Sequence, residues 1–327
     1  MSGNHNGSLE RAKDIVRAAA ETGVDCLKFQ TYTAETMTLD LLSDDFVIRD
    51  ENSLWNGRQL YELYQEARTP WEWHEELFKV ARDLGVLSFS TPFDVTAVDF
   101  LESLNVPMYK VASFEITHIP LIRRIAETGK PMIMSTGMAS EDDIALAIKT
   151  AQDAGATEIA ILKCTSAYPA NASDANLATI PDMREKFGVE VGLSDHTLGT
   201  GVSVASINFG ATLIEKHFTL DRGDGGVDSD FSLEPWEMKL LKAETKRAWH
   251  ARGEVRYSGT SNEQKSKQVR QSVYPSRAIA AGEKFSADNL KICRPGFSLP
   301  PKSYDALLGQ PAKRDIAVGE RLTEQDL

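Results

Sequence analysis

The chain contains 327 residues, of which 42% are hydrophobic and 26% are charged, as is ordinary for a soluble globular protein. This length suits one barrel of ~250 residues with a small appendage. The net charge of -12 argues against a general nucleic-acid binder, although a few buried lysines could still form a pocket for an anion. No apolar run approaches the ~20 residues of a membrane span and no signal peptide precedes the first expected helix, so we expect a cytoplasmic protein that binds neither nucleic acid nor membrane.

The cysteines lie far apart and show neither CxxC nor zinc-binding spacing: Cys26, Cys164 and Cys293. We expect reduced thiols. Cys26 and Cys164 fall in expected strands, which favours a packing role for both.

The chain begins with a loop-like segment, Asn4-His5-Asn6-Gly7, and Ser8 then caps a helix expected to extend to about residue 21. Residues 25–31 predict a strand in which Lys28 and Gln30 share a face at the carboxyl end. A buried lysine there needs a partner, and a ligand anion is one candidate. Residues 32–70 are less regular and rich in aromatic and acidic residues, so we expect a long excursion over the mouth of a barrel.

A regular alternation of helices and strands follows. Helices are expected over residues 71–84, 95–104, 120–127, 141–154, 180–187 and 200–210, and strands over 86–90, 108–112, 131–135 and 158–163, with two more beginning near 192 and 214. Each strand ends in polar or charged residues. With the strand at 25–31 this makes seven strand–helix repeats, which favours a parallel barrel from which the eighth strand is missing.

Two histidines follow the last two expected strands at matching positions. His196 lies in Ser194-Asp195-His196-Thr197, and His217 lies in Glu215-Lys216-His217-Phe218. Period-two alternation puts Glu215 and His217 on one face, the inward one if the strand belongs to a barrel. The pair could hold one divalent cation, or each could be an ordinary core or surface histidine; the matching positions favour the cation.

After a helix expected over 234–252, the composition becomes polar. We expect a barrel domain over residues 1–257, a linker over 258–268 and a small β-rich module over 269–327. This module contains a weak pseudo-repeat, with similar frames at 279–286 and 316–323, and is marginal as an independent domain.

Taken together, these motifs resemble the sialic acid synthase family. The resemblance is carried by the segments at residues 4–7, 28–31, 90–93, 109–113, 193–197 and 215–219, while the C-terminal module, with Cys293-Arg294-Pro295-Gly296, resembles the family's antifreeze-like (SAF) domain. It implies a TIM (β/α)8-type barrel whose first strand is missing here. Loops at 53–57, 69–74 and 222–229 are most similar to the branch of the family that makes pseudaminic acid, and loops carry sugar specificity.

The resemblance also implies a reaction. Phosphoenolpyruvate condenses with an open-chain diacetamido-trideoxy hexose of the altrose type, with cleavage of the carbon–oxygen bond of the enol ester, to give a nine-carbon 2-keto acid and phosphate. His196 and His217 would hold a divalent metal, manganese first and magnesium or cobalt as alternatives. The implied catalytic residues are Lys110, Glu115 and Asp228, and the implied substrate-binding residues are Lys28, Gln30, Thr91, Ser113, Ser135, Ser166, Tyr168, Ser194, Asp195 and Arg294.

The family further implies a domain-swapped homodimer, in which the C-terminal module of one subunit covers the barrel mouth of the other and places Arg294 over the sugar.

Two of the implied site residues raise a question of geometry or of identity. Lys110 and Ser113 have opposite parity, so the strand must end or bulge between them. Ser166 stands where the neuraminate branch carries an asparagine.

Family members carry a first strand that ends in a glutamate immediately before the position of Met1, and this sequence has neither. We expect a translation start some twenty residues upstream; the alternative is a truncated, impaired sugar-binding homologue. Other open readings are a synthase for N-acetylneuraminate or legionaminate, a Schiff-base aldolase that uses Lys28 or Lys110, and a barrel whose polar strand ends are merely solvated.

Overall fold

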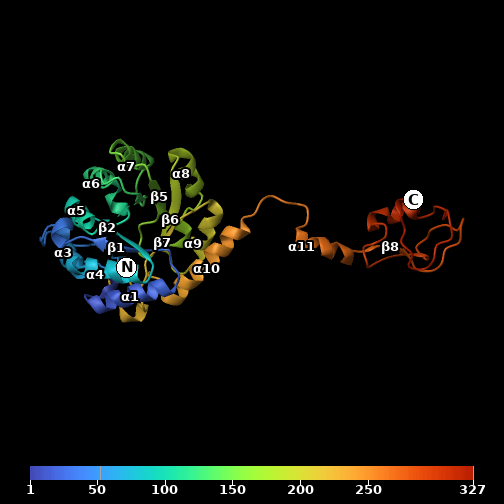
Figure 1. Ribbon diagram of the computed structural model, residues 1–327, viewed down its shortest axis with the longest axis horizontal. Coiled ribbons are helices and arrows are strands. Elements are labelled where there is room, and N and C mark those ends of the chain that lie inside the picture. The colour runs from blue at the N-terminus through green and yellow to red at the C-terminus, as the bar shows by residue number, and fades with distance from the viewer. Residues whose placement is uncertain (52, 327) are drawn as a thin grey trace. The chain divides into compact units, whose positions relative to one another are not determined.

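The computed structural model describes residues 1–51 and 53–326, and it separates into two compact units, Met1–Arg252 and Gly253–Leu327 (Figure 1). Leu327, the last residue of the expected C-terminal module, lies outside the described residues. Within the described part of the chain, no helix combines the length and the apolar character that crossing a membrane requires.

The first unit is built on one parallel sheet whose strands follow one another in chain order. They are β1 (Cys26–Thr31), β2 (Leu87–Pro92), β3 (Tyr109–Val111), β4 (Met132–Ser135), β5 (Ile159–Cys164), β6 (Glu190–Asp195) and β7 (Ile214–Lys216). The seven expected strands and their parallel order are confirmed. The unit is a seven-stranded, incomplete TIM barrel.

Helices surround this curved sheet (Figure 1). They are α1 (Leu9–Glu21), α2 (Ala34–Met37), α3 (Leu60–Ala67), α4 (His74–Asp83), α5 (Val95–Ser103), α6 (Ile119–Ala126), α7 (Glu141–Asp153), α8 (Thr179–Phe187), α9 (Gly201–Ser206) and α10 (Pro235–Ala251). In α1 the Ser8 side chain accepts a hydrogen bond from the backbone N–H of Arg11, as expected of an N-cap. The face formed by Ala12, Ile15, Val16 and Ala19 is buried, at the spacing of an amphipathic helix.

Three expected elements differ in detail. The helix expected over 71–84 begins as a 3₁₀ turn, η3 (Trp71–Trp73), because Pro70 precedes it and fixes the entry of the chain. The helix expected over 200–210 ends as the 3₁₀ turn η6 (Ile207–Phe209). The irregular excursion contains α3, which has a single buried residue, Leu63, and so carries no wide apolar stripe to reveal it in the sequence.

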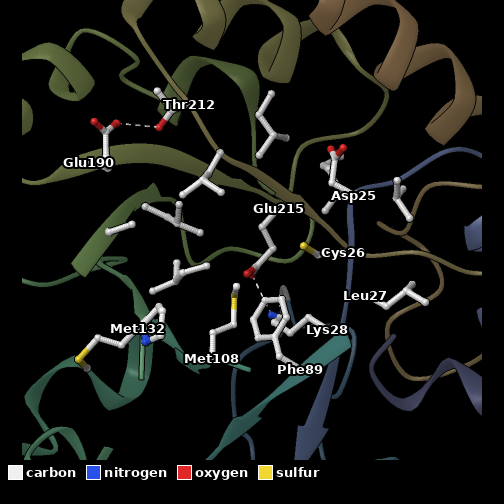
Figure 2. A pocket seen from close by; sticks show the side chains of 18 of the residues that line it. Asp25, Cys26, Leu27, Lys28, Phe89, Met108, Met132, Glu190, Thr212 and Glu215 are labelled. Carbon is white, nitrogen blue, oxygen red and sulfur yellow. Dashed lines mark hydrogen bonds and ion pairs between the residues drawn. The ribbon is translucent and has the colours of Figure 1, made fainter. Parts of the chain in front are cut away.

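The sheet is open between its two edge strands. Among the described residues, β1 pairs only with β2, and β7 pairs only with β6. A cavity of about 1260 Å³ lies at this opening, lined by residues of both edges and by apolar side chains from the interior such as Phe89, Met108 and Met132 (Figure 2). The interior of a closed barrel of this kind is filled by side chains, so the cavity follows from the incomplete closure.

The second unit is small and mostly irregular. An antiparallel pair, β8 (Ser272–Pro275) and β9 (Leu290–Cys293), joins a core that includes Val273, Phe285 and Leu307. The segment expected as a linker contains α11 (Ser261–Gln264) and the 3₁₀ turn η8 (Lys265–Val269), and α12 (Tyr304–Leu307) lies nearer the C-terminus.

The pseudo-repeat is visible in the fold of this second unit. Ile279 and Ile316 pair with each other as an antiparallel bridge. The turn after each isoleucine is closed in the same way: the Glu283 carboxylate accepts from the N–H of Ala280, and the Glu320 carboxylate accepts from the N–H of Ala317. The two frames are therefore structurally equivalent turns that pack on one core.

Candidate active site

Two lysines and a glutamate from three different strands meet inside the barrel. Lys28 Nζ on β1 lies 2.8 Å from Glu215 Oε1 on β7, and Lys110 Nζ on β3 lies 3.7 Å from Glu215 Oε2. Figure 2 shows the side chains of Glu215 and Lys28 pointing toward each other. Lys110 Nζ also donates to Ser135 Oγ at 2.6 Å, and Ser194 Oγ donates to Glu215 at 3.3 Å. The fold thus brings together four predicted phosphoenolpyruvate-binding residues.

Burial sets the charges in this cluster. Desolvation lowers the pKa of Lys110, which is 1% exposed, to about 8. Burial alone would raise the pKa of the Glu215 carboxyl, but the positive charges of Lys110 and Lys28 outweigh it and hold that pKa well below its usual range. One carboxylate therefore faces two cationic side chains. An anionic substrate would supply the charge that the cluster lacks.

A group of hydroxyls borders the lysines. Strand β3 ends at Val111 and the 3₁₀ helix η4 (Ser113–Thr117) follows, so the expected break between Lys110 and Ser113 is confirmed. A side chain at Gly137 would place its Cβ 2.5 Å from the Cβ of Ser113 and 2.6 Å from Ser166 Oγ, and the φ of Gly137 is +40°. Glycine is thus required where the backbone approaches these two serines, as in a cradle for a phosphate group.

The two histidines lie side by side, with ring centroids 5.4 Å apart. His196 Nδ1 lies 2.9 Å from the carbonyl oxygen of Thr165 and, as an N–H, donates to it; His217 Nδ1 lies 3.1 Å from Ser2 Oγ. Each ring is oriented through Nδ1, and among the described residues neither Nε2 has a hydrogen-bond partner. These are the conditions under which Nε2 lone pairs bind a metal.

No group of three or more His, Cys, Asp or Glu residues that could hold a metal occurs in the part of the chain that the structure describes. Two imidazole nitrogens would therefore leave several coordination positions for water and substrate oxygens, as a catalytic metal site requires. The two imidazole nitrogens are therefore the protein donors that this arrangement offers to a divalent cation.

Two carboxyl groups lie near these centres. Glu115 Oε2 is buried without a hydrogen-bond partner, and burial raises the pKa of the Glu115 carboxyl to about 7. Asp228 Oδ2 lies 3.7 Å from His217 Nδ1, and burial raises the pKa of the Asp228 carboxyl as well. Both groups can therefore exchange protons closer to neutral pH than exposed carboxylates do.

The N-terminal asparagine motif holds the loop that carries Asp228. Asn4 is fully buried and its Nδ2 donates to the carbonyl of Phe218 at 3.0 Å and to Ser232 Oγ at 2.8 Å. Ser232 Oγ in turn donates to the backbone carbonyl of Asp228 at 2.6 Å. Asn6 Nδ2 donates to the carbonyl of Gly225 at 3.2 Å. The asparagine motif therefore holds the Asp228 loop by hydrogen bonds that reach the backbone of that loop.

The remaining predicted site residues lie in three different places. Gln30 and Thr91 are register partners on β1 and β2, and Thr91 Oγ1 is buried without a hydrogen-bond partner. The Tyr168 ring lies 4.5 Å from that of His196. Arg294 is exposed in the second unit, at the end of β9.

Asp195 does not face the site. Its carboxylate is occupied by Thr197, Ser203 and Lys216, with Ser203 Oγ at 2.5 Å and Lys216 Nζ at 3.1 Å. Alternation along β6 turns Ser194 inward and Asp195 outward, toward α9. We therefore withdraw the expectation that Asp195 binds substrate and assign it a structural role.

Cys164 and Cys26 both lie in surroundings that a simple packing role does not describe. Cys164 is buried, but its Sγ lies 3.8 Å from His196 Nδ1 and 3.8 Å from Ser166 Oγ, so it belongs to the site. Burial raises the pKa of the Cys164 thiol, but His196, Ser113 and Lys110 together outweigh it and lower that pKa to about 7. The position of Cys164 directly after the strand expected over 158–163, at a polar strand end, was the signal available in the sequence. Cys26 is exposed at the open edge of β1, so its expected packing role was wrong.

Known proteins are similar to this chain in sequence and in fold. A sequence model of the NeuB family matches residues 15–257, and a model of the SAF domain matches residues 270–327. A pseudaminic acid synthase of Campylobacter jejuni is 41% identical over 100% of this chain and 94% of its own, and that of Helicobacter pylori is 40% identical over 100% and 96%. The crystal structure of an N-acetylneuraminic acid synthetase from Leptospira borgpetersenii, in complex with citrate, is 30% identical with a TM-score of 0.71, over 81% of this chain and 87% of its own.

Proposed function

We infer the reaction from one premise: this chain belongs to the NeuB family and is a phosphoenolpyruvate-dependent nonulosonic acid synthase, a transferase. Within that class, we propose that its sugar is an open-chain diacetamido-trideoxy hexose of the altrose type and that its product is pseudaminic acid. Identity of 41% over the whole chain to a pseudaminic acid synthase supports this choice, as do the loops at 53–57, 69–74 and 222–229.

The observation that carries the proposal is the cluster of Lys28 and Lys110 on Glu215, beside a two-histidine centre. Phosphoenolpyruvate would bring its carboxylate and phosphate to the two lysines and to the hydroxyls of Ser113, Ser135, Ser166 and Ser194. Lys110 is buried, so its ammonium is stabilised when this anion arrives. The binding of phosphoenolpyruvate and the protonation of Lys110 are therefore coupled.

His196 and His217 would hold the divalent cation, which when bound supplies Lewis acidity that polarises the sugar aldehyde. The hydrogen bonds at Nδ1 of both rings keep Nε2 available for it. These contacts orient the histidines before any ligand is present, so less ordering is needed when substrate binds.

We assign the proton transfers to the two buried carboxyl groups. C3 of phosphoenolpyruvate attacks the aldehyde carbon, and Glu115, partly protonated near neutral pH, donates a proton to the aldehyde oxygen. Water then adds at C2, losing its proton to Asp228. The bond between C2 and the bridging oxygen breaks, the C2 hydroxyl gives its proton to the departing phosphate, and the 2-keto acid remains.

We also propose that the active species is a homodimer in which Arg294 reaches the sugar site of the partner subunit. Its support is the family resemblance of the C-terminal module and the exposure of Arg294. A planar guanidinium can donate several hydrogen bonds to sugar oxygens or to an acetamido carbonyl.

The test is an assay of phosphate and 2-keto acid release from phosphoenolpyruvate with manganese and a panel of acetamido sugars. We expect the altrose-type diacetamido sugar to have the highest kcat/KM. A higher value for N-acetylmannosamine would move the chain to the neuraminate branch, and release with none of them would favour an impaired homologue. Borohydride trapping with pyruvate should label neither Lys28 nor Lys110, which separates this reaction from a Schiff-base aldolase.

A further inference from the structure

Trp55 lies in the excursion that precedes α3, in a turn closed by its own backbone. The N–H of Ile48 donates to the carbonyl of Arg58 at 2.9 Å, and the N–H of Gly57 donates to the carbonyl of Ile48 at 2.8 Å. The Trp55 N–H donates to Ser53 Oγ at 3.2 Å. These bonds present Trp55 on a short, closed loop, and its ring stays partly exposed.

The indole of Trp55 is fixed against the loop that carries Asp228. Its Nε1–H donates to the carbonyl of Val227 at 3.0 Å, and Val227 directly precedes Asp228. The polar end of the side chain is therefore already used. What Trp55 can offer to a ligand is its apolar face.

Trp55 lies at one end of a chain of aromatic contacts that leads to the two histidines. Its ring centroid lies 6.0 Å from that of Tyr168, which lies 4.5 Å from His196 and 5.2 Å from Phe231. Phe231 lies 4.9 Å from His217. The rings form one apolar boundary that begins at the proposed cation site and ends at Trp55.

This boundary differs in chemistry from the rest of the site. The phosphoenolpyruvate side presents lysines and hydroxyls, whereas the side that leads from the histidines to Trp55 presents aromatic rings. A substrate that spans both would have an anionic end and an apolar end. In the proposed sugar the reacting aldehyde is at C1, and the methyl group of a 6-deoxy sugar is at the opposite end of the carbon chain.

We propose that Trp55 is a specificity-determining residue, whose indole face receives the C6 methyl group of the sugar. The inference rests on the proposed function. It gives a reason for preferring a 6-deoxy sugar over its 6-hydroxy analogue, because a hydroxyl against the indole face would lose hydrogen bonds to water. A single apolar contact of this kind discriminates by roughly 10–200-fold.

The experiment compares kcat/KM for the diacetamido-trideoxy hexose and for its 6-hydroxy analogue, in wild type and in Trp55→Ala. We expect the variant to lose about tenfold or more on the 6-deoxy sugar, with little change on the analogue, so that the preference collapses. Trp55→Phe should restore most of the preference. The KM for phosphoenolpyruvate should stay within about twofold, because its groups lie with the lysines.

A matched control is Trp236→Ala, which removes an indole that is 62% exposed on α10 and donates to Glu234. It should leave both sugars unaffected. Equal losses of kcat/KM on both sugars in Trp55→Ala would show that Trp55 only supports the Val227 loop and would overturn the inference. A variant that loses activity on neither sugar would also overturn it. If the wild type turns over neither sugar, the proposed function itself fails, an outcome distinct from the other two.

Discussion

Glu115 offers a test in which catalysis and stability should move in opposite directions. Its carboxyl is buried with one oxygen lacking a partner, and burial raises its pKa from 4.5 to about 7. Between these values the folded chain binds more protons than the unfolded chain, so stability falls as pH rises through this window. The difference corresponds to about 3 kcal/mol at pH values above 7.

Glu115→Gln keeps the shape of the side chain but cannot ionise. At pH 8 we expect the variant to be more stable than wild type by about 1–3 kcal/mol, because water penetration reduces the full value. At pH 4, where the carboxyl is neutral in the folded chain and mostly protonated in the unfolded chain, the two proteins should differ by less than about 0.5 kcal/mol. The kcat should fall at least ~100-fold, since the proton donor is lost.

Urea unfolding followed by tryptophan fluorescence measures this directly, because all 5 tryptophans, Trp55, Trp71, Trp73, Trp236 and Trp249, lie in the barrel unit. Glu102→Gln is a control of opposite sign. Burial would raise the pKa of Glu102, but Lys130 and Tyr109 outweigh it and lower that pKa, so this variant should be less stable at pH 8. A Glu115→Gln protein that is destabilised at pH 8, or whose stability difference does not depend on pH, would refute the reasoning.

Three further outcomes are expected. His196→Ala and His217→Ala should each lose manganese binding by calorimetry while the exposed His250→Ala retains it; wild-type stoichiometry in either of the first two would remove the assignment. Gly137→Ala should raise the KM for phosphoenolpyruvate by about tenfold or more, because its Cβ would displace Ser113 and Ser166, and an unchanged KM would exclude the cradle. Arg294→Ala should raise the KM of the sugar about tenfold. When Arg294→Ala subunits are mixed with His217→Ala subunits, the mixed dimer should recover up to half of normal activity. A mixture that stays inactive would place the arginine in its own subunit's site.

The repeating pattern of strands made the barrel predictable. Alternation placed Glu215 inward and Lys216 outward, and the opposite parity of Lys110 and Ser113 required the break that the structure places at the end of β3. Both follow from the alternation of side chains between the two faces of a strand, which can be predicted from a single sequence. The resemblance to the family supplied most of the site residues.

Other features depend on contacts between distant segments. Glu215 was predicted to face inward, but its pairing with Lys28 and Lys110 joins β7 to β1 and β3, and no local pattern shows it. Asn4 was a motif without a role until the fold placed it under the loop of Asp228. Asp195 was misassigned because proximity to His196 in sequence does not place both side chains on one face of the strand.

In the proposed reaction, phosphoenolpyruvate reacts at carbon and loses phosphate by carbon–oxygen cleavage. Phosphoenolpyruvate labelled with ¹⁸O at the bridging oxygen tests this in one turnover with manganese and the diacetamido sugar. We expect the label in the released phosphate and an unlabelled keto oxygen in the nine-carbon product, once exchange with water has been controlled with unlabelled substrate in ¹⁸O water. Label retained in the keto acid, with unlabelled phosphate, would mean that the phosphorus–oxygen bond breaks and would contradict the mechanism.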